Sequence, residues 1–232
     1  PDELAMINYT SGTTGFSKGV MVPYRALWGN ADFAEDVLGK KIKPGDSIIS
    51  ILPMAHMYGM AFEFIFEFIK GCHIFYLTRI PSPAIIAEAF GRIKPAVIIS
   101  VPLVIEKIIR KKVFPKIQNN RMRMLLHMPV ISKKVKICDQ VSNAFGGNFY
   151  EVIIGGAAFN QEVESFLHSV GFKYTVGYGA TECAPIICYE DYKNFVPGSC
   201  GKAALHMMVR IDSPDPENVP GEILAKGPNV ML

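Results

Sequence analysis

Short apolar runs alternate along the chain with longer segments in which apolar positions recur every three or four residues. The runs rich in strand-forming residues are Ala5–Tyr9, Ser47–Leu52, His73–Leu77, Ala96–Val101, Tyr150–Ile154 and Lys173–Val176. The segments with helical periodicity are Tyr24–Leu38, Met60–Ile69, Pro83–Ile93, Leu103–Val113, Lys134–Phe145 and Gln161–Val170. This alternation predicts an α/β fold in which helices cover a largely parallel sheet.

Residues next to the predicted helices support their boundaries. Ser82 and Pro83 combine a capping residue with proline at the first helical position. Gly71, Gly146 and Gly171 each follow a predicted helix, where glycine often ends the helical turn. These capping residues and glycines therefore agree with the helix bounds that the periodicity predicts.

The pattern changes near Val196, after which glycine and proline separate short strands such as Met207–Ile211 and Glu222–Ala225. We expect residues 1–195 to form the α/β part and residues 196–232 to begin a small β-rich subdomain. The chain opens almost directly on a strand and stops at Leu232 without a polar tail. We therefore expect it to be a piece of a longer protein.

Composition narrows the class of partner. The chain is 50% hydrophobic and 19% charged, as in an ordinary globular protein. A net charge of +3, without basic residues interleaved with aromatics, gives no support for nucleic-acid binding. We expect a small-molecule substrate.

Cysteine usage and the lack of targeting segments bear on location. The five cysteines show no C-x-x-C spacing and are interpreted as reduced thiols of a cytoplasmic protein: Cys72, Cys138, Cys183, Cys188 and Cys200. The sequence has no signal peptide and no uninterrupted apolar run of about 18 residues. We expect a soluble protein.

The segment Tyr9–Gly19 has the chemistry of a phosphate-binding loop. Its glycines permit backbone conformations that direct N–H groups inward, its hydroxyls can bind phosphate oxygens, and Lys18 supplies a cation. The P-loop of NTPases is excluded, because Ser17 occupies the required glycine position when counted from Gly12. A flexible surface turn is the alternative interpretation. The candidate ligand groups are Thr10, Ser11, Gly12, Thr13, Thr14, Gly15 and Lys18.

This loop resembles the signature Y-T-S-G-T-T-G-x-P-K-G of the adenylate-forming superfamily, which includes acyl-CoA synthetases, luciferases and peptide-synthetase adenylation domains. Ser17 replaces the usual proline, which removes a rigid residue but no phosphate ligand. Three further motifs follow in the family's order. Leu52–Gly59 is similar to the P-x-x-H stretch and contains His56, Gly155–Ala158 resembles the adenine-contacting turn, and Gly177–Glu182 resembles Y-G-x-T-E.

One weaker motif points within the superfamily. Val101-Pro102 followed by Glu106-Lys107-Ile108 resembles the V-P-x-x-x-E-K-I stretch of long-chain fatty acyl-CoA synthetases. Each motif also has an ordinary interpretation: His56 as a loop histidine, Gly155-Gly156 as a turn after a strand, and Glu182 as a surface carboxylate. The glycine turns, however, directly follow predicted parallel strands, and ligands of open α/β sheets bind at the carboxyl ends of strands.

The resemblance implies roles for individual residues. Tyr178 would stack on or flank adenine, and the edge of the adenine would meet Gly156, Ala157 and Ala158. Gly177 and Gly179 belong to the same nucleotide-binding motif as Tyr178. Thr181 would bind a phosphate oxygen and Glu182 would hold Mg²⁺, which prefers oxygen ligands. Lys18 and the loop hydroxyls would hold pyrophosphate, and His56 would lie near the junction of the nucleotide and acyl pockets.

The resemblance also implies a reaction. A carboxylic acid, most simply a fatty acid, reacts with ATP to give acyl-AMP, and coenzyme A then takes the acyl group as a thioester. The family places its ribose-binding acid, hinge and lid lysine beyond Leu232, so we expect the lid domain to be absent and the chain alone to be inactive. Adenylation of amino or aryl acids, loading of a carrier protein, and a non-catalytic nucleotide-binding module remain alternatives.

Two segments carry further hypotheses. Tyr58–Ile69, rich in Met, Phe and Ile, would either line an acyl pocket or form a core helix whose polar positions are Glu63 and Glu67. Lys107–Lys136 contains ten Lys or Arg residues. It would form either solvated helices or a peripheral contact with anionic membrane lipid.

Overall fold

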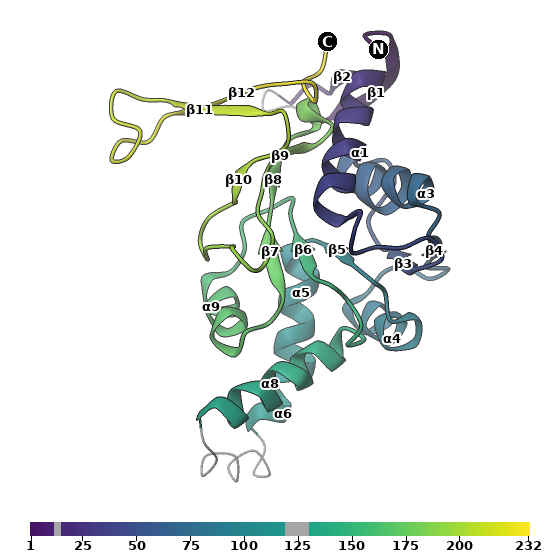
Figure 1. Ribbon diagram of the computed structural model, residues 1–232, viewed down its shortest axis with the longest axis vertical. Helices are drawn as coiled ribbons and strands as arrows, with labels where there is room; N and C mark the ends of the chain where they lie inside the picture. Colours follow the sequence, from purple (N-terminus) through teal and green to yellow (C-terminus); the bar gives the residue numbers. More distant parts are fainter. Residues whose placement is uncertain (12–14, 119–129) are drawn as a thin grey trace.

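The computed structural model describes residues 1–11, 15–118 and 130–232, and its central strands are parallel (Figure 1). β3 (Ser47–Ser50) pairs with β4 (His73–Tyr76). β6 (Val152–Ile154) pairs with β5 (Ile98–Ser100) on one side and β7 (Tyr174–Val176) on the other. The Ala96 N–H donates to the Ser47 carbonyl over 2.9 Å, which brings β3 beside the start of β5. The predicted α/β fold is confirmed.

Both faces of the central strands are buried. Ile98, Val152 and Ile154 join one apolar cluster. This cluster also contains side chains from four helices, which are α4 (Pro83–Ile93), α5 (Pro102–Ile108), α8 (Val130–Ala144) and α9 (Gln161–Val170). Ile99 and Ile153 point the opposite way into a second cluster with α1 and the helical segment after β3. Because successive side chains of a strand alternate between its faces, strands that are buried at every position, such as β5, β6 and β7, require this double cover.

Three helices have the predicted bounds: α1 (Tyr24–Leu38), α4 (Pro83–Ile93) and α9 (Gln161–Val170). The Ser82 hydroxyl accepts a hydrogen bond from the Ile85 N–H over 3.3 Å at the start of α4. Glycines adopt positive φ after three helical segments, as their positions in the sequence indicated: Gly71, Gly146 and Gly171.

Three other helical segments are longer than predicted, and two of them contain π-helical turns. The first runs through α2 (Met57–Gly59), the π-helix η1 (Met60–Ile65) and α3 (Phe66–Lys70). The second runs through α5 (Pro102–Ile108), the π-helix η2 (Ile109–Val113) and α6 (Phe114–Gln118), and α8 spans Val130–Ala144.

The first predicted strand does not join the parallel sheet. β1 (Leu4–Thr10) forms an antiparallel hairpin with β2 (Lys18–Pro23), which the periodicity analysis did not predict. Burial explains the second strand, because Val20 and Val22 alternate with exposed neighbours and point into an apolar cluster. The loop between the two strands is therefore a hairpin connection.

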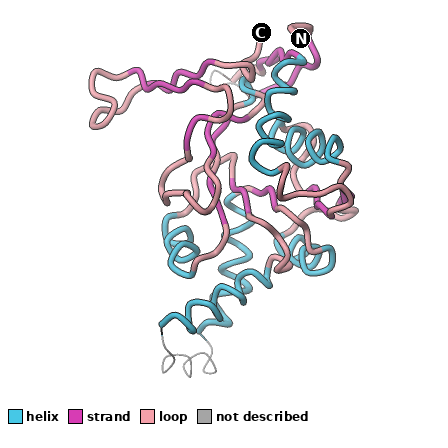
Figure 2. Tube along the Cα trace, in the orientation of Figure 1, coloured by secondary structure: helices cyan, strands magenta, loops and turns pink. Residues whose placement is uncertain are grey.

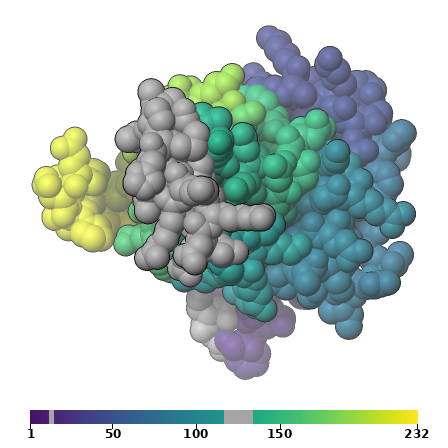
Figure 3. Space-filling model, turned by 90° about the horizontal axis from the view of Figure 1, so that it is seen from below, coloured from purple at the N-terminus to yellow at the C-terminus, as the bar shows by residue number. Residues whose placement is uncertain are grey.

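The C-terminal region is antiparallel. β9 (Ile186–Tyr189) pairs with β8 (Tyr178–Gly179) and β10 (Lys202–Ala203). The hairpin of β11 (Met208–Asp212) and β12 (Glu222–Lys226) projects from the body, as the tube in Figure 2 and the yellow atoms in Figure 3 show. The two termini lie at one end of the molecule (Figure 1).

Two sequence expectations about the whole chain can be compared with the structure. All five cysteines are free thiols. Among the residues that the structure describes, none of the helices is long and apolar enough to cross a membrane.

Candidate functional site

The main cavity has a volume of about 750 Å³ and opens where three parallel strands end. Val101 follows β5, Gly155 and Gly156 follow β6, and Gly177 follows β7, and all four line the cavity. His56, Tyr178, Gly179 and Thr181 line it as well. Residues from four sequence motifs thus converge at the carboxyl ends of the strands, where ligands of α/β sheets bind.

Tyr58 closes one wall of this cavity through close packing on a glycine. Its hydroxyl donates to the Ile153 carbonyl over 3.1 Å, and burial raises the pKa of this phenol. A Cβ on Gly155 would lie 3.2 Å from the Tyr58 ring, so the first glycine of the turn allows the ring to approach the backbone. His56, two residues earlier, is exposed at the start of α2.

Thr181 and Glu182 form the short 3-10 helix η4 (Thr181–Cys183). Thr181 is half-buried at the main cavity, whereas Glu182 is exposed and is not among the lining residues. The Glu182 backbone carbonyl accepts a hydrogen bond from the Met231 N–H over 2.8 Å. The Glu182 carboxylate is an exposed hard oxygen donor, which fits the chemistry of Mg²⁺.

Asn30, which the sequence analysis missed, holds this turn in place. Its side-chain amide donates to the Cys183 carbonyl over 3.2 Å and accepts from the Ile186 N–H over 3.0 Å. The side chain is almost wholly buried within α1. An asparagine inside an otherwise apolar helix face was the available signal, because asparagine is a poor interior helix former.

The candidate phosphate loop connects the strands of the β1–β2 hairpin, in which Thr10 lies opposite Lys18. Thr10 is half-buried, and Ser11, Gly15 and Lys18 are exposed. None of these four is among the residues that line the main cavity. Gly12, Thr13 and Thr14 lie outside the described residues.

The hairpin is nevertheless fixed beside two other motifs. Val20 and Val22 pack with Met57, next to His56, and with Ala184, two residues after Glu182. The Asn8 side chain donates to the Ala55 carbonyl over 2.8 Å. Segments far apart in sequence therefore meet at one end of the sheet.

A second cavity of about 470 Å³ adjoins the first. Both cavities share Gly156, Gly177, Tyr178 and Gly179 as lining residues. Ala157 and Ala158 line only the second of the two. All residues assigned from the sequence to the adenine pocket therefore line one or both of these adjoining cavities.

The remaining wall of the main cavity is mostly apolar. Its lining includes Phe33, Ala34, Val37 and Leu38 from α1, Ile99, Ile153 and Ile186 from the strands, and Pro81, Pro83 and Ile86 around the start of α4. From the segment Tyr58–Ile69, both Tyr58 and Phe62 line the cavity. Leu103, Val104 and Lys107, which lie within or beside the long-chain motif, also line it.

The segment Tyr58–Ile69 buries its acidic residues. Glu63 accepts hydrogen bonds from the Ser50 hydroxyl and from the Ile51 and Leu52 N–H groups, at 2.9 to 3.2 Å. Burial raises its pKa to about 8 despite these bonds. Glu63 therefore fastens the π-helical turn to the end of β3, a role that periodicity did not reveal.

The basic segment Lys107–Lys136 is only partly described, because residues 119–129 lie outside the described part. Within it, Arg110 pairs with Glu162 of α9 over 2.7 Å, and Lys107 lines the main cavity. These contacts favour neither membrane binding nor solvated helices, so both hypotheses remain open.

The sequence of this chain is similar to sequences of known proteins. Residues 1–232 match the family described as AMP-binding enzyme. The chain is 29% identical over 248 residues to long-chain-fatty-acid–CoA ligase 4 of Saccharomyces cerevisiae and 26% identical over 254 residues to long-chain-fatty-acid–CoA ligase 1 of Homo sapiens. These matches cover 98% and 99% of the chain but 35% and 36% of the relatives. The chain thus spans about a third of their length.

Solved structures resemble the fold as a whole. o-Succinylbenzoate CoA synthetase (MenE) from Bacillus subtilis, in complex with its acyl-adenylate intermediate, has a TM-score of 0.73 at 22% identity over 99% of the chain and 42% of that protein. The N-terminal domain of FACL13 from Mycobacterium tuberculosis has a TM-score of 0.72 at 18% identity over 100% of the chain and 52% of that protein. At these identities the likeness establishes a shared fold.

Proposed function

Because the chain belongs to the family of AMP-binding enzymes, we propose that it forms the ATP- and acyl-binding part of a ligase that joins a carboxylic acid to coenzyme A. One observation carries this proposal. His56, Gly156 and the residues from Gly177 to Thr181 line the same cavity as a large apolar wall, at the carboxyl ends of β5, β6 and β7. Such a cavity can hold a polar reacting group at one end and an acyl chain along its wall.

The proposed nucleotide position uses the polar end of the cavity. Tyr178 flanks the adenine, whose edge meets the backbone of Gly156 to Ala158, while Thr181 donates its hydroxyl to a phosphate oxygen. Lys18 and the loop hydroxyls hold the departing pyrophosphate. Glu182 would hold Mg²⁺, which supplies positive charge to the phosphates when it is bound.

The proposed chemistry has two steps. In the first, a carboxylate oxygen attacks the α-phosphorus of ATP, and the bond to the bridging oxygen of pyrophosphate breaks. In the second, the thiol of coenzyme A attacks the acyl carbonyl carbon, and AMP leaves. The protein acts mainly by orientation and charge stabilisation in such reactions. His56 lines the main cavity and would orient the carboxylate.

A fatty acid is the proposed substrate class. The apolar wall supports it, as do the relatives named long-chain-fatty-acid–CoA ligases. Loading of a carrier protein is a second candidate for the acceptor step, because the cavity residues favour an acyl chain without distinguishing between thiol acceptors.

Pyrophosphate exchange by the full-length protein tests the proposal. The assay would use a panel of fatty, aryl and amino acids, and thioester formation would then be measured with coenzyme A and with carrier protein. We expect exchange with fatty acids and product with coenzyme A. Exchange with none of the acids would refute ligase activity and favour a non-catalytic nucleotide-binding module. We expect the 232-residue chain alone to give no thioester.

A further inference from the structure

A third cavity, of about 290 Å³, lies behind the apolar wall of the main cavity. The two spaces share three lining residues: Phe33, Val37 and Tyr189. His56 and Thr181 line only the main cavity of this pair. These three shared side chains therefore form a partition between the main cavity and an outer one.

The partition is aromatic and tightly packed. The rings of Phe33 and Tyr189 meet edge to face, with centroids 5.4 Å apart, and both side chains are buried. Val37 lies four residues after Phe33 and so shares its face of α1. Phe62 packs against Phe33 from the side of the main cavity, with ring centroids 6.1 Å apart.

A buried hydrogen bond fixes the Tyr189 ring. Its hydroxyl donates to Glu151, a fully buried carboxylate whose other oxygen accepts from the Tyr192 N–H over 3.1 Å. Burial raises the pKa of Glu151 to about 7. Because both ends of the tyrosine side chain are held, rotation of the ring out of the partition would break the Glu151 contact and the Phe33 contact together.

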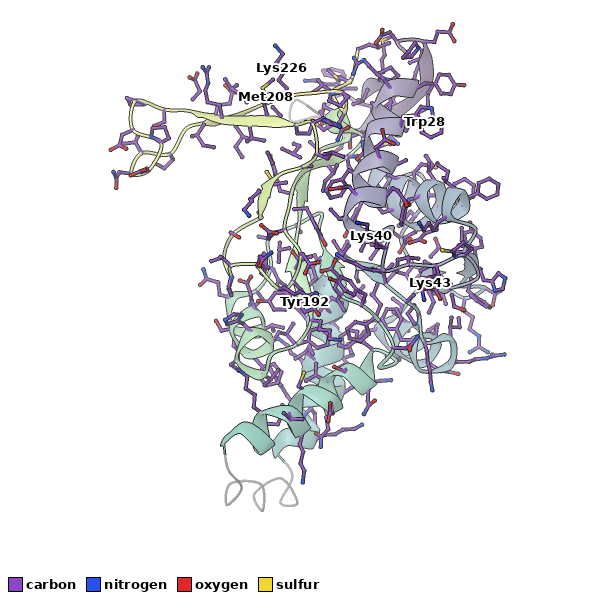
Figure 4. All side chains as sticks on the ribbon, in the orientation of Figure 1. Trp28, Lys40, Lys43, Tyr192, Met208 and Lys226 are labelled. Carbon is purple, nitrogen blue, oxygen red and sulfur yellow. The ribbon has the colours of Figure 1, made fainter. Side chains whose placement is uncertain are left out.

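Charged side chains make up a much larger part of the lining of the outer cavity than of the main one. Lys41 pairs with Asp191 over 2.6 Å, and Lys202 pairs with Glu190 over 2.8 Å. Lys40, labelled just beyond the end of α1 in Figure 4, also lines this space. A methylene chain that entered it would displace water from paired charges, which is unfavourable.

We propose that the partition of Phe33, Val37 and Tyr189 sets the longest acyl chain that the main cavity accepts. The terminal methyl group of a substrate stops against these side chains, because the next space is lined by paired charged side chains. This inference rests on the proposed function, since it assumes that the acyl chain occupies the main cavity. It adds the residues that decide chain length.

The test measures kcat/KM of the full-length protein for straight-chain acids of increasing length. Phe33→Ala removes most of one partition side chain and should move the upper length limit to longer acids. Val37→Phe adds bulk to the same partition and should move the limit to shorter acids. A methylene in an apolar pocket changes specificity by on the order of tenfold or more, so the shift should be clear over neighbouring chain lengths.

Two control variants separate the partition from general damage. Phe66 is buried in the same apolar cluster as Phe33, but its side chain does not line the main cavity. Phe66→Ala should therefore destabilise the protein without moving the length limit. Tyr189→Phe keeps the ring and should also keep the limit, while lowering the melting temperature. Phe33→Leu provides a milder truncation if the alanine variant fails to fold.

The outcomes distinguish this inference from the proposed function. If Phe33→Ala and Val37→Phe both retain activity and show the same upper length limit as the unmodified protein, the partition is overturned and the ligase proposal still stands. Absence of exchange with any acid in the unmodified protein would overturn both. Opposite shifts in the two variants, with no shift for Phe66→Ala, would support the partition.

Discussion

At the residue scale, the most unusual feature of this chain is that several glutamate side chains are buried. Glu63 and Glu67 are fully buried on the helical segment after β3, while Phe68 on the same segment is 71% exposed. The pattern of apolar and polar residues alone would place Phe68 in the core and the two glutamates at the surface. Glu63 is retained inside because three hydrogen bonds offset part of its desolvation.

Glu182 carries the most specific prediction at the residue scale. Glu182→Ala removes an exposed carboxylate without leaving a cavity, so folding should be unaffected. In the full-length protein we expect a loss of Mg²⁺-dependent pyrophosphate exchange of at least about a hundredfold, similar to removal of one charge-stabilising group. Glu88→Ala, at an exposed glutamate of α4, is the matched control and should retain exchange. Full exchange in Glu182→Ala would contradict the metal assignment.

Asn30 gives a second prediction at this scale. Asn30→Ala leaves the Ile186 N–H and the Cys183 carbonyl without their partner inside the protein, which should cost about 2 kcal/mol of unfolding free energy. Denaturant unfolding measures this cost, and pyrophosphate exchange should fall as well because η4 loses its anchor. Asn143→Ala, at an exposed position of α8, should change stability by less than about 0.5 kcal/mol. Equal effects of the two variants would refute the anchoring role.

At the scale of elements, glycine turns let the chain pass close to itself beside the site. A Cβ on Gly179 of β8 would lie 2.3 Å from the Pro185 carbonyl oxygen, a backbone atom that cannot swing away. Gly179 is therefore needed so that the segment before β9 can pass close to β8, in addition to any contact with a nucleotide. The sequence motif alone suggests only the nucleotide contact.

Gly179→Ala should therefore destabilise the fold as well as reduce activity. We expect a loss of at least about 2 kcal/mol, because overpacking against backbone forces the two segments apart. Gly91→Ala is the matched control: it lies within α4, and an added Cβ there would meet no atom within 4 Å. That change should be neutral or stabilising by up to about 1 kcal/mol. A Gly179→Ala protein as stable as Gly91→Ala would show that the Pro185 backbone leaves room for a side chain at this position.

At the scale of the whole molecule, stability should depend on pH through carboxylates deep in the fold. Burial raises the pKa of Glu67 to about 7, and the opposing effect of the nearby Cys72 thiol is smaller. The folded state therefore holds this proton more tightly than the unfolded chain. The resulting stabilisation is complete below about pH 4.5 and is lost as the pH rises through about 7.

Glu67→Gln isolates this effect. The variant should gain stability relative to the unmodified protein as the pH rises from about 4.5 to above 7, by up to about 3 kcal/mol. Denaturant unfolding at a series of pH values measures the difference. The same substitution at exposed Glu88 should give a difference that does not vary with pH. A Glu67→Gln difference that is flat across this range would place the Glu67 carboxylate in contact with water.

The sequence by itself determined the α/β alternation, the bounds of α1, α4 and α9, and the order of the nucleotide motifs. These features are local: helical periodicity, caps and glycine turns are written in residues a few positions apart. The placement of glycine motifs after strands also located the main cavity, because strand ends are where α/β sheets bind ligands.

Only the tertiary structure decided the features that join distant residues. The pairing of β1 with β2, the burial of Glu63, the anchoring of η4 by Asn30, and the Phe33–Tyr189 partition depend on which surfaces meet in space. Asn30 and Ile186 are 156 positions apart, and no local pattern encodes such a contact. The boundary of the main cavity is therefore a property of packing between elements, and the loop motif acquires a position through the contacts of its hairpin with distant segments.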